Sequence, residues 1–304
     1  MVVKGNAVMS QIDRKGITSF LLITFALTFG IELVLILAGL RLSSFPSAFA
    51  GYAIAAVMWI PSLAALITAK FITGEGLAQA NIRVGKIRPY IVTALLLPLS
   101  FAIIYTGSWV LGLAEPDWDL SQFLGMVSDM SGNDIPPLPS PGLAILGVFA
   151  ATTFVTPFFN SVFGFGEELG WRGYLLPKLM PLGKKAAYIL IGLIWAVWHL
   201  PLIAIGFTYP SSPLLGFILF AGLTTTFGVY LNEMTLAHES TILAGWIHGV
   251  FNSQKLGIWP MLFPTAHPLL GGYAGLVGIV VWLVLALITI KLVNAKQTYG
   301  QQAG

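Results

Sequence analysis

The sequence predicts an all-α fold, a polytopic bundle of about eight transmembrane helices. Hydrophobic residues make up 57% of the 304 residues and charged residues only 9%, whereas a soluble domain has roughly 25% charged residues. The hydrophobic residues also gather in runs of about 20, the length at which a helix crosses a bilayer. We therefore expect one integral membrane domain over residues 1–304, located in the cell membrane, with a polar cavity open towards the cytoplasmic half.

The apolar runs predict the spans in order. The first run follows Lys4, Arg14 and Lys15, as a signal peptide would, but it exceeds the roughly 7–15 residues of a signal core. We therefore interpret it as a retained span. The predicted spans lie at roughly 17–40, 48–70, 89–113, 142–165, 185–206, 213–232, 240–260 and 272–293.

The charged residues of the loops predict the orientation. An even number of spans places both termini on one side. If that side is the cytoplasm, all 15 Lys and Arg residues except Arg41 and Lys255 lie inside, as the positive-inside rule requires. The segment 115–141 then lies outside; it is acidic and carries a proline cluster, which predicts an ordered or extended loop rather than a helix.

Composition also limits the possible chemistry. The chain has no cysteine, so disulfides, thiol nucleophiles and cysteine metal sites are excluded. The net charge of +3 is small and spread along the chain, and it gives no indication of a nucleic-acid partner.

The first polar motif is Glu167-Glu168-x-x-x-Arg172, which follows a long apolar run. Glu168 and Arg172 are spaced i, i+4, which suits an ion pair on one helix face. Glu167 points about 100° away from that face and has no local partner, so it is a candidate base. The alternative is a cytoplasmic loop with ordinary surface charges.

Two further motifs place polar residues inside other apolar runs. His199 follows Trp195 and Trp198, and it either belongs to a site or hydrogen-bonds a neighbouring backbone carbonyl. His248 and Asn252 are spaced i, i+4 and face one way. They either hold helices together or donate two hydrogen bonds to an oxyanion. Because polar side chains in hydrocarbon are costly and usually functional, we expect the three motifs to meet in one site.

The three motifs in this order resemble those of the CPBP family, the CAAX-protease and bacteriocin-processing intramembrane proteases, which includes the Rce1-type prenyl-protein endopeptidases. The resemblance covers residues 142–260, where we expect the protease core. One departure is Trp195, where phenylalanine is common in the family.

The resemblance implies an intramembrane peptidase and gives each motif residue a role. Glu167 activates a water that His199 helps to hold, while His248 and Asn252 stabilise the oxyanion. Glu168 and Arg172 organise the first motif. The implied partners are membrane lipid and a membrane-associated or lipidated peptide or protein substrate, cleaved near a lipidated C-terminus.

Alternatives stay open for both metal and function. Glu167, His199 and His248 can form a zinc triad with water as fourth ligand, or Glu167 can polarise the water without a metal, which we favour. The chain can also be a non-enzymatic protein, such as a bacteriocin immunity factor or a scaffold. A transporter with a proton relay is the third possibility, although no pair of matching inverted halves is visible. Glu32, deep in the first predicted span, is assigned no role.

Overall fold

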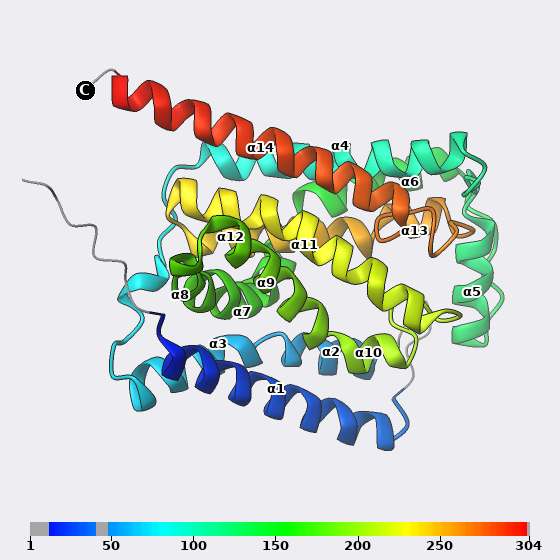
Figure 1. Cartoon of the computed structure of the whole chain (residues 1–304). Helices are drawn as coiled ribbons and strands as arrows, with labels where there is room; N and C mark the ends of the chain where they lie inside the picture. Colours follow the sequence, from blue (N-terminus) through cyan, green and yellow to red (C-terminus); the bar gives the residue numbers. More distant parts are fainter. Residues whose placement is uncertain (1–11, 41–47, 303–304) are drawn as a thin grey trace, which may run out of the picture.

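The computed structural model describes residues 12–40 and 48–302, and these residues form helices and loops without a β-strand. The all-α prediction is confirmed over this part of the chain. Lys4 and Arg41, which entered the orientation prediction, lie outside it. Helices α7, α9, α11 and α12 form the middle of the bundle, with α1 and α14 on opposite sides (Figure 1).

The helix starts follow local sequence. Proline stands in the first turn of several helices, where its fixed φ suits the helix and its missing N–H costs no hydrogen bond, and Ser240 caps α12 by accepting a hydrogen bond from the Leu243 amide at 3.0 Å. The bounds are α1 Arg14–Leu37, α2 Ala48–Val57, α3 Ile60–Ile67, η1 Thr68–Ile72, η2 Ala78–Ala80, α4 Arg88–Val110, α5 Ser121–Ser131, α6 Pro141–Phe154, α7 Thr156–Glu168, η3 Leu169–Leu175, α8 Leu176–Leu179, η4 Met180–Leu182, α9 Lys184–Trp198, α10 Leu200–Ala204, α11 Pro213–His238, α12 Thr241–Lys255, α13 Ile258–Leu262 and α14 Leu276–Gln302.

The count of about eight spans is not confirmed. Among the described residues, five helices are long and apolar enough to cross a membrane, or up to six if the pair bent by 41° between α6 and α7 is one span. The predicted spans at 185–206 and 240–260 contain α9 and α12, each of 15 residues. A helix of that length rises only about 22 Å, less than the roughly 30 Å of a hydrocarbon core. Burial against other helices explains the apolar character of α12, since most of its side chains are buried.

Helix α5 corrects the interpretation of the acidic segment. It occupies residues 121–131, within the stretch predicted to be a loop without helix. The proline cluster that carried the prediction lies beyond its end, where the chain is irregular as expected. The helix stands apart at one end of the bundle (Figure 1).

Glycine allows α7 and α12 to approach each other closely. These two helices pack along their length, and α12 presents Gly245 and Gly249 to α7, one turn apart. A Cβ atom on Gly249 would lie 2.5 Å from the Ser161 backbone nitrogen, and one on Gly245 would lie 2.9 Å from the Phe165 Cα. Small residues spaced by four let helix backbones meet in this way. The contact brings the end of α7, with its two glutamates, beside the middle of α12.

The segment after α7 is fixed by a second close contact. It continues as the π-helix η3, a wide turn that is frequent at functional sites. Gly170 lies against α3, where a Cβ atom would be 2.5 Å from the Pro61 Cβ. The Ser62 hydroxyl donates a 2.6 Å hydrogen bond to the Gly166 carbonyl. Helix α3 therefore holds both sides of the Glu167–Glu168 pair in place.

Candidate active site

The predicted ion pair of the first motif is present and buried. Arg172 Nη1 donates to Glu168 Oε1 at 3.0 Å and to Oε2 at 2.9 Å, and both side chains have 0% exposure. The surface-loop alternative does not fit this burial. An unpaired charge at such depth would be strongly destabilising, so each residue requires the other.

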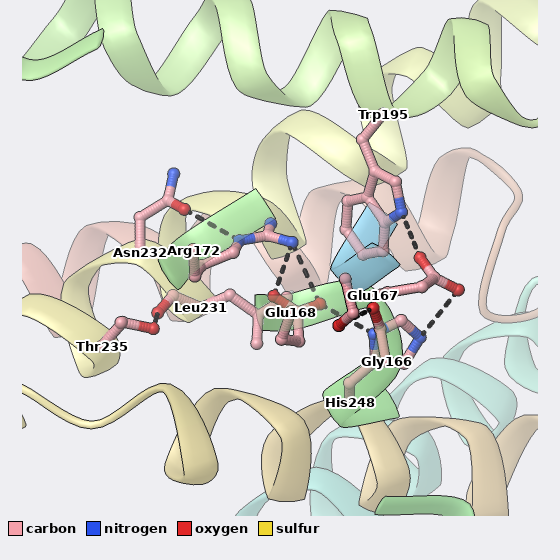
Figure 2. Close-up of polar contacts among 10 residues, drawn as sticks. Gly166, Glu167, Glu168, Arg172, Trp195, Leu231, Asn232, Thr235 and His248 are labelled. Atoms are coloured by element: carbon pink, nitrogen blue, oxygen red, sulfur yellow. Dashed lines mark hydrogen bonds and ion pairs between the residues drawn. The ribbon is translucent and has the colours of Figure 1, made fainter. Parts of the chain in front are cut away.

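Two residues that the sequence did not single out as partners hold the guanidinium from other helices. Arg172 Nε donates to Asn232 Oδ1 of α11 at 3.0 Å, and the guanidinium lies over the Trp195 ring of α9 at 4.5 Å from its centroid. Figure 2 shows Arg172 between Asn232 and Glu168. The ion pair thus joins α11 and α9 to the first motif.

Glu168 also fixes the orientation of His248. The His248 Nδ1 atom lies 2.8 Å from Glu168 Oε1, so the first and third motifs meet directly. Because Glu168 is ion-paired with Arg172, it is an ionised acceptor, and Nδ1 must be the donor. The other ring nitrogen, Nε2, is then directed at Glu167, whose Oε1 lies 4.0 Å away (Figure 2).

Glu167 takes its second contact from α9. The Trp195 indole N–H donates to Glu167 Oε2 at 2.8 Å. Oε1 is left facing His248 Nε2 at a distance too long for a direct hydrogen bond and suited to a bridging water. Glu167 therefore has one oxygen fixed by a donor and one oxygen without a direct hydrogen bond.

His199 joins the site through Trp195. Its Nδ1 atom lies 2.9 Å from the Trp195 carbonyl oxygen, which can only accept, so Nδ1 is the donor and Nε2 is free to accept. The ring packs against Trp198 and Phe220, each with a centroid distance of 4.7 Å. Trp195 thus contacts Glu167 with its indole and His199 with its carbonyl. The two alternatives for His199, a site residue or a partner of a backbone carbonyl, are compatible with each other.

Asn252 lies on the same face of α12 as His248, one turn further along. It is 6% exposed, and its Oδ1 atom is buried without a hydrogen-bond partner among the described residues. Buried polar atoms are nearly always paired, so this carboxamide is available to a bound molecule.

All six motif residues are buried. The residues assigned to the chemistry keep a small accessible fraction: Glu167 2%, His248 5%, Asn252 6% and His199 8%. The supporting residues Glu168 and Arg172 are 0% and 1% exposed. The predicted polar cavity open towards the cytoplasmic half is not confirmed.

The zinc alternative is not supported by the spacing of the donors. In the ranges 12–40 and 48–302, no group of three or more His, Asp or Glu side chains is arranged to hold a metal ion. This includes the candidate ligands Glu167, His199 and His248.

Two polar residues near the site were underrated from the sequence. Asn232 lies in the apolar helix α11 and is buried. An amide within an apolar run was the sequence signal that could have identified it. Glu32 lies on the buried face of α1, 1% exposed, with both oxygens unpaired among the described residues and within electrostatic range of Glu167. The sequence showed both as polar residues in apolar runs but could not show which way they face.

The fold and this cluster define a multi-pass helical membrane protein with a buried acid, imidazole and carboxamide site. Residues 143–254 match the family model for Rce1-like proteins, described as type II CAAX prenyl endopeptidases. The predicted resemblance to this protease family is confirmed over these residues.

A curated relative agrees with this family. A stretch of 44 residues is 46% identical to CAAX prenyl protease 2 of Methanococcus maripaludis. The match covers 14% of this chain and 16% of the relative, so it spans well under two thirds of that protein.

Proposed function

We propose that this chain is an intramembrane endopeptidase that hydrolyses a peptide bond with a water activated by Glu167. The observation that carries the proposal is the gap of 4.0 Å between Glu167 Oε1 and His248 Nε2, with each group fixed from behind, by Trp195 and by Glu168. A water between these two atoms would be held by groups that need not move. Preorganisation of this kind is a large part of enzymatic rate enhancement.

The reaction uses one water and one proton shuttle. Glu167 takes a proton from the water as its oxygen bonds to the peptide carbonyl carbon, and the carbonyl oxygen becomes an oxyanion. Protonated Glu167 then gives that proton to the peptide nitrogen, and the C–N bond breaks to leave an acid and an amine. General-base catalysis contributes about 10²- to 10⁴-fold in rate.

His199 and His248 have different roles in this proposal. His199 uses Nδ1 on the Trp195 carbonyl, so its Nε2 accepts a hydrogen bond from the attacking water. His248 uses Nδ1 on Glu168, so Nε2 can donate only in the imidazolium form, first to the bridging water and then to the oxyanion that forms as this water attacks. Asn252 provides the second oxyanion donor through its Nδ2, and each such donor contributes about 10²- to 10³-fold.

The proposed substrate is a membrane-associated peptide or protein that is cleaved near its lipidated C-terminus. The name of the archaeal relative, a CAAX prenyl protease, supports a prenylated substrate. The apolar outer surfaces of the helices support membrane lipid as the surrounding solvent, since residues such as Leu37 and Val110 are 78% exposed. The proposed reaction is metal-free, because the donor spacing does not suit a metal.

Purified protein in liposomes, incubated with a farnesylated peptide, tests the proposal. Glu167→Gln keeps the size of the side chain and removes the base, so cleavage should fall by at least about 100-fold while folding and insertion persist. Glu115→Gln, on an exposed acidic loop, is the matched control and should cleave normally. Undiminished turnover by Glu167→Gln would exclude the assigned base. Stoichiometric zinc lost together with activity would exclude the metal-free chemistry.

A further inference from the structure

Lys255 lies on the helix face that carries two of the proposed catalytic residues. His248, Asn252 and Lys255 follow one another on α12 at spacings of four and three residues, which places them on one side of the helix. Helical side chains also lean towards the helix N-terminus, so the lysine stem extends back from the last turn towards Asn252. The sequence-based topology had placed this residue on the outer side, apart from the site.

Aromatic contacts also connect Lys255 to the site. Its ammonium lies over the Phe207 ring, 5.3 Å from the centroid. Phe207 in turn stacks on the His199 ring, with 6.1 Å between centroids and 13° between planes. The lysine and the water-holding histidine therefore contact the same aromatic ring.

Lys255 makes no ion pair with any residue in the described part of the chain, and the aromatic contact with Phe207 satisfies none of its N–H groups. Lysine in a half-buried position usually has an anionic partner, because burial of an unpaired charge is costly. The missing anion can be supplied by a bound molecule.

We propose that Lys255 is a specificity-determining residue that binds a carboxylate of the substrate close to the scissile bond. This inference rests on the proposed function. Lys255 is the third residue after Asn252, a rise of about 4.5 Å along the helix, and an extended peptide advances about 3.3 Å per residue. A substrate carboxylate bound to Lys255 therefore belongs to a residue within about three positions of the scissile bond. The carbonyl oxygen of that bond is the one that contacts His248 and Asn252 as an oxyanion. The carboxylate belongs either to the peptide C-terminus or to an acidic side chain.

Four peptides distinguish these two sources. All carry one farnesylated cysteine followed by three residues. The first pair differs only at the C-terminus, as free acid or carboxamide. The second pair consists of carboxamides that differ only in one of the three residues, Glu or Gln. Cleavage rates in liposomes give kcat/KM for each peptide with the wild-type protein, with Lys255→Met, which keeps the apolar stem, and with Lys255→Arg, which keeps the charge.

For the wild type we expect kcat/KM to be about 10- to 100-fold higher for the charged member of at least one pair, the range for a hydrogen bond to a charged group. Lys255→Met should abolish that ratio and lower the rate only for the charged peptide, while Lys255→Arg should restore the ratio. A preference in the first pair identifies the terminal carboxylate, and one in the second pair identifies the side chain.

Equal ratios in the wild type and in Lys255→Met would overturn the role of Lys255, and so would a wild type without a preference in either pair. Both results leave the proposed protease intact, because all these peptides are still cleaved in a reaction that depends on Glu167. Cleavage by Glu167→Gln would instead refute the proposed function, whatever the peptide ratios are. The two failures are thus distinguishable.

Discussion

The buried pair Glu168–Arg172 gives the sharpest prediction for stability. Both side chains have 0% exposure, and Arg172 makes three hydrogen bonds, two to Glu168 and one to Asn232. Arg172→Met keeps much of the volume and leaves Glu168 as a buried carboxylate whose remaining partner is His248. Removal of one member of a buried pair costs about 3–5 kcal/mol of unfolding free energy.

A double substitution separates the charge from the loss of packing. Glu168→Gln combined with Arg172→Met removes both charges, and the glutamine oxygen still accepts from His248. Because no uncompensated charge is then buried, we expect the double variant to recover most of the loss, to within about 1–2 kcal/mol of the wild type. The surface pair of Arg83 and Glu239, with side chains 53% and 65% exposed, supplies a control: Arg83→Met should cost about 1 kcal/mol or less.

Equilibrium unfolding in mixed detergent micelles, followed by tryptophan fluorescence, measures these free energies. The reasoning is refuted if Arg172→Met costs no more than Arg83→Met. It is also refuted if the double variant is as unstable as Arg172→Met alone, since the cost would then come from packing rather than from an unpaired charge.

Three further predictions follow from other contacts. Trp195→Phe removes the indole donor to Glu167 and should lower kcat/KM by about 10- to 100-fold, the range for a hydrogen bond to a charged group. Gly249→Val places a side chain within the contact of α7 and α12 and should cost about 1–3 kcal/mol of unfolding free energy through overpacking. The hydrogen bond from Lys178 lowers the pKa of Asp13 below its ordinary value of 3.8, so Asp13 stabilises the folded protein above that value and loses the effect as the pH falls through its lowered pKa. Asp13→Asn should therefore be less stable than the wild type at pH 7, by about 1 kcal/mol or less for so exposed a group, and the difference should vanish in acid.

The tryptophan and glycine variants have matched controls. Trp246→Phe loses an indole hydrogen bond to the Tyr90 carbonyl, away from the site, and should leave kcat/KM unchanged; equal losses in the two tryptophan variants would contradict the role of Trp195. Gly147→Val, where a Cβ atom meets nothing within 4 Å, should be nearly neutral, and a similar cost at both glycines would remove the packing argument. For Asp13, a stability difference that persists unchanged at low pH would show that charge is not its cause.

Much of the site could be predicted from local spacing. The pair Glu168–Arg172 depends only on the geometry of one helical turn, and the pairing of His248 with Asn252 on one face of α12 has the same origin. The motifs, taken in order, also predicted the resemblance that the family match over residues 143–254 confirms. What local spacing could not give is the contact between motifs: the bond from Trp195 to Glu167 joins residues 28 apart in the chain, and that from His248 to Glu168 joins residues 80 apart.

The sequence by itself determined that this is a helical membrane protein, because a chain with 9% charged residues has too little polar surface to face water on all sides. It also determined which polar residues lie within apolar runs. The tertiary structure decided which of those runs face other helices, as α12 does. Hydropathy reflects the free energy of transfer out of water and does not distinguish lipid from protein interior. It decided the site as well, because the close approach of α7 to α12 at Gly245 and Gly249 determines which nitrogen of His248 meets Glu168 and which is directed at Glu167.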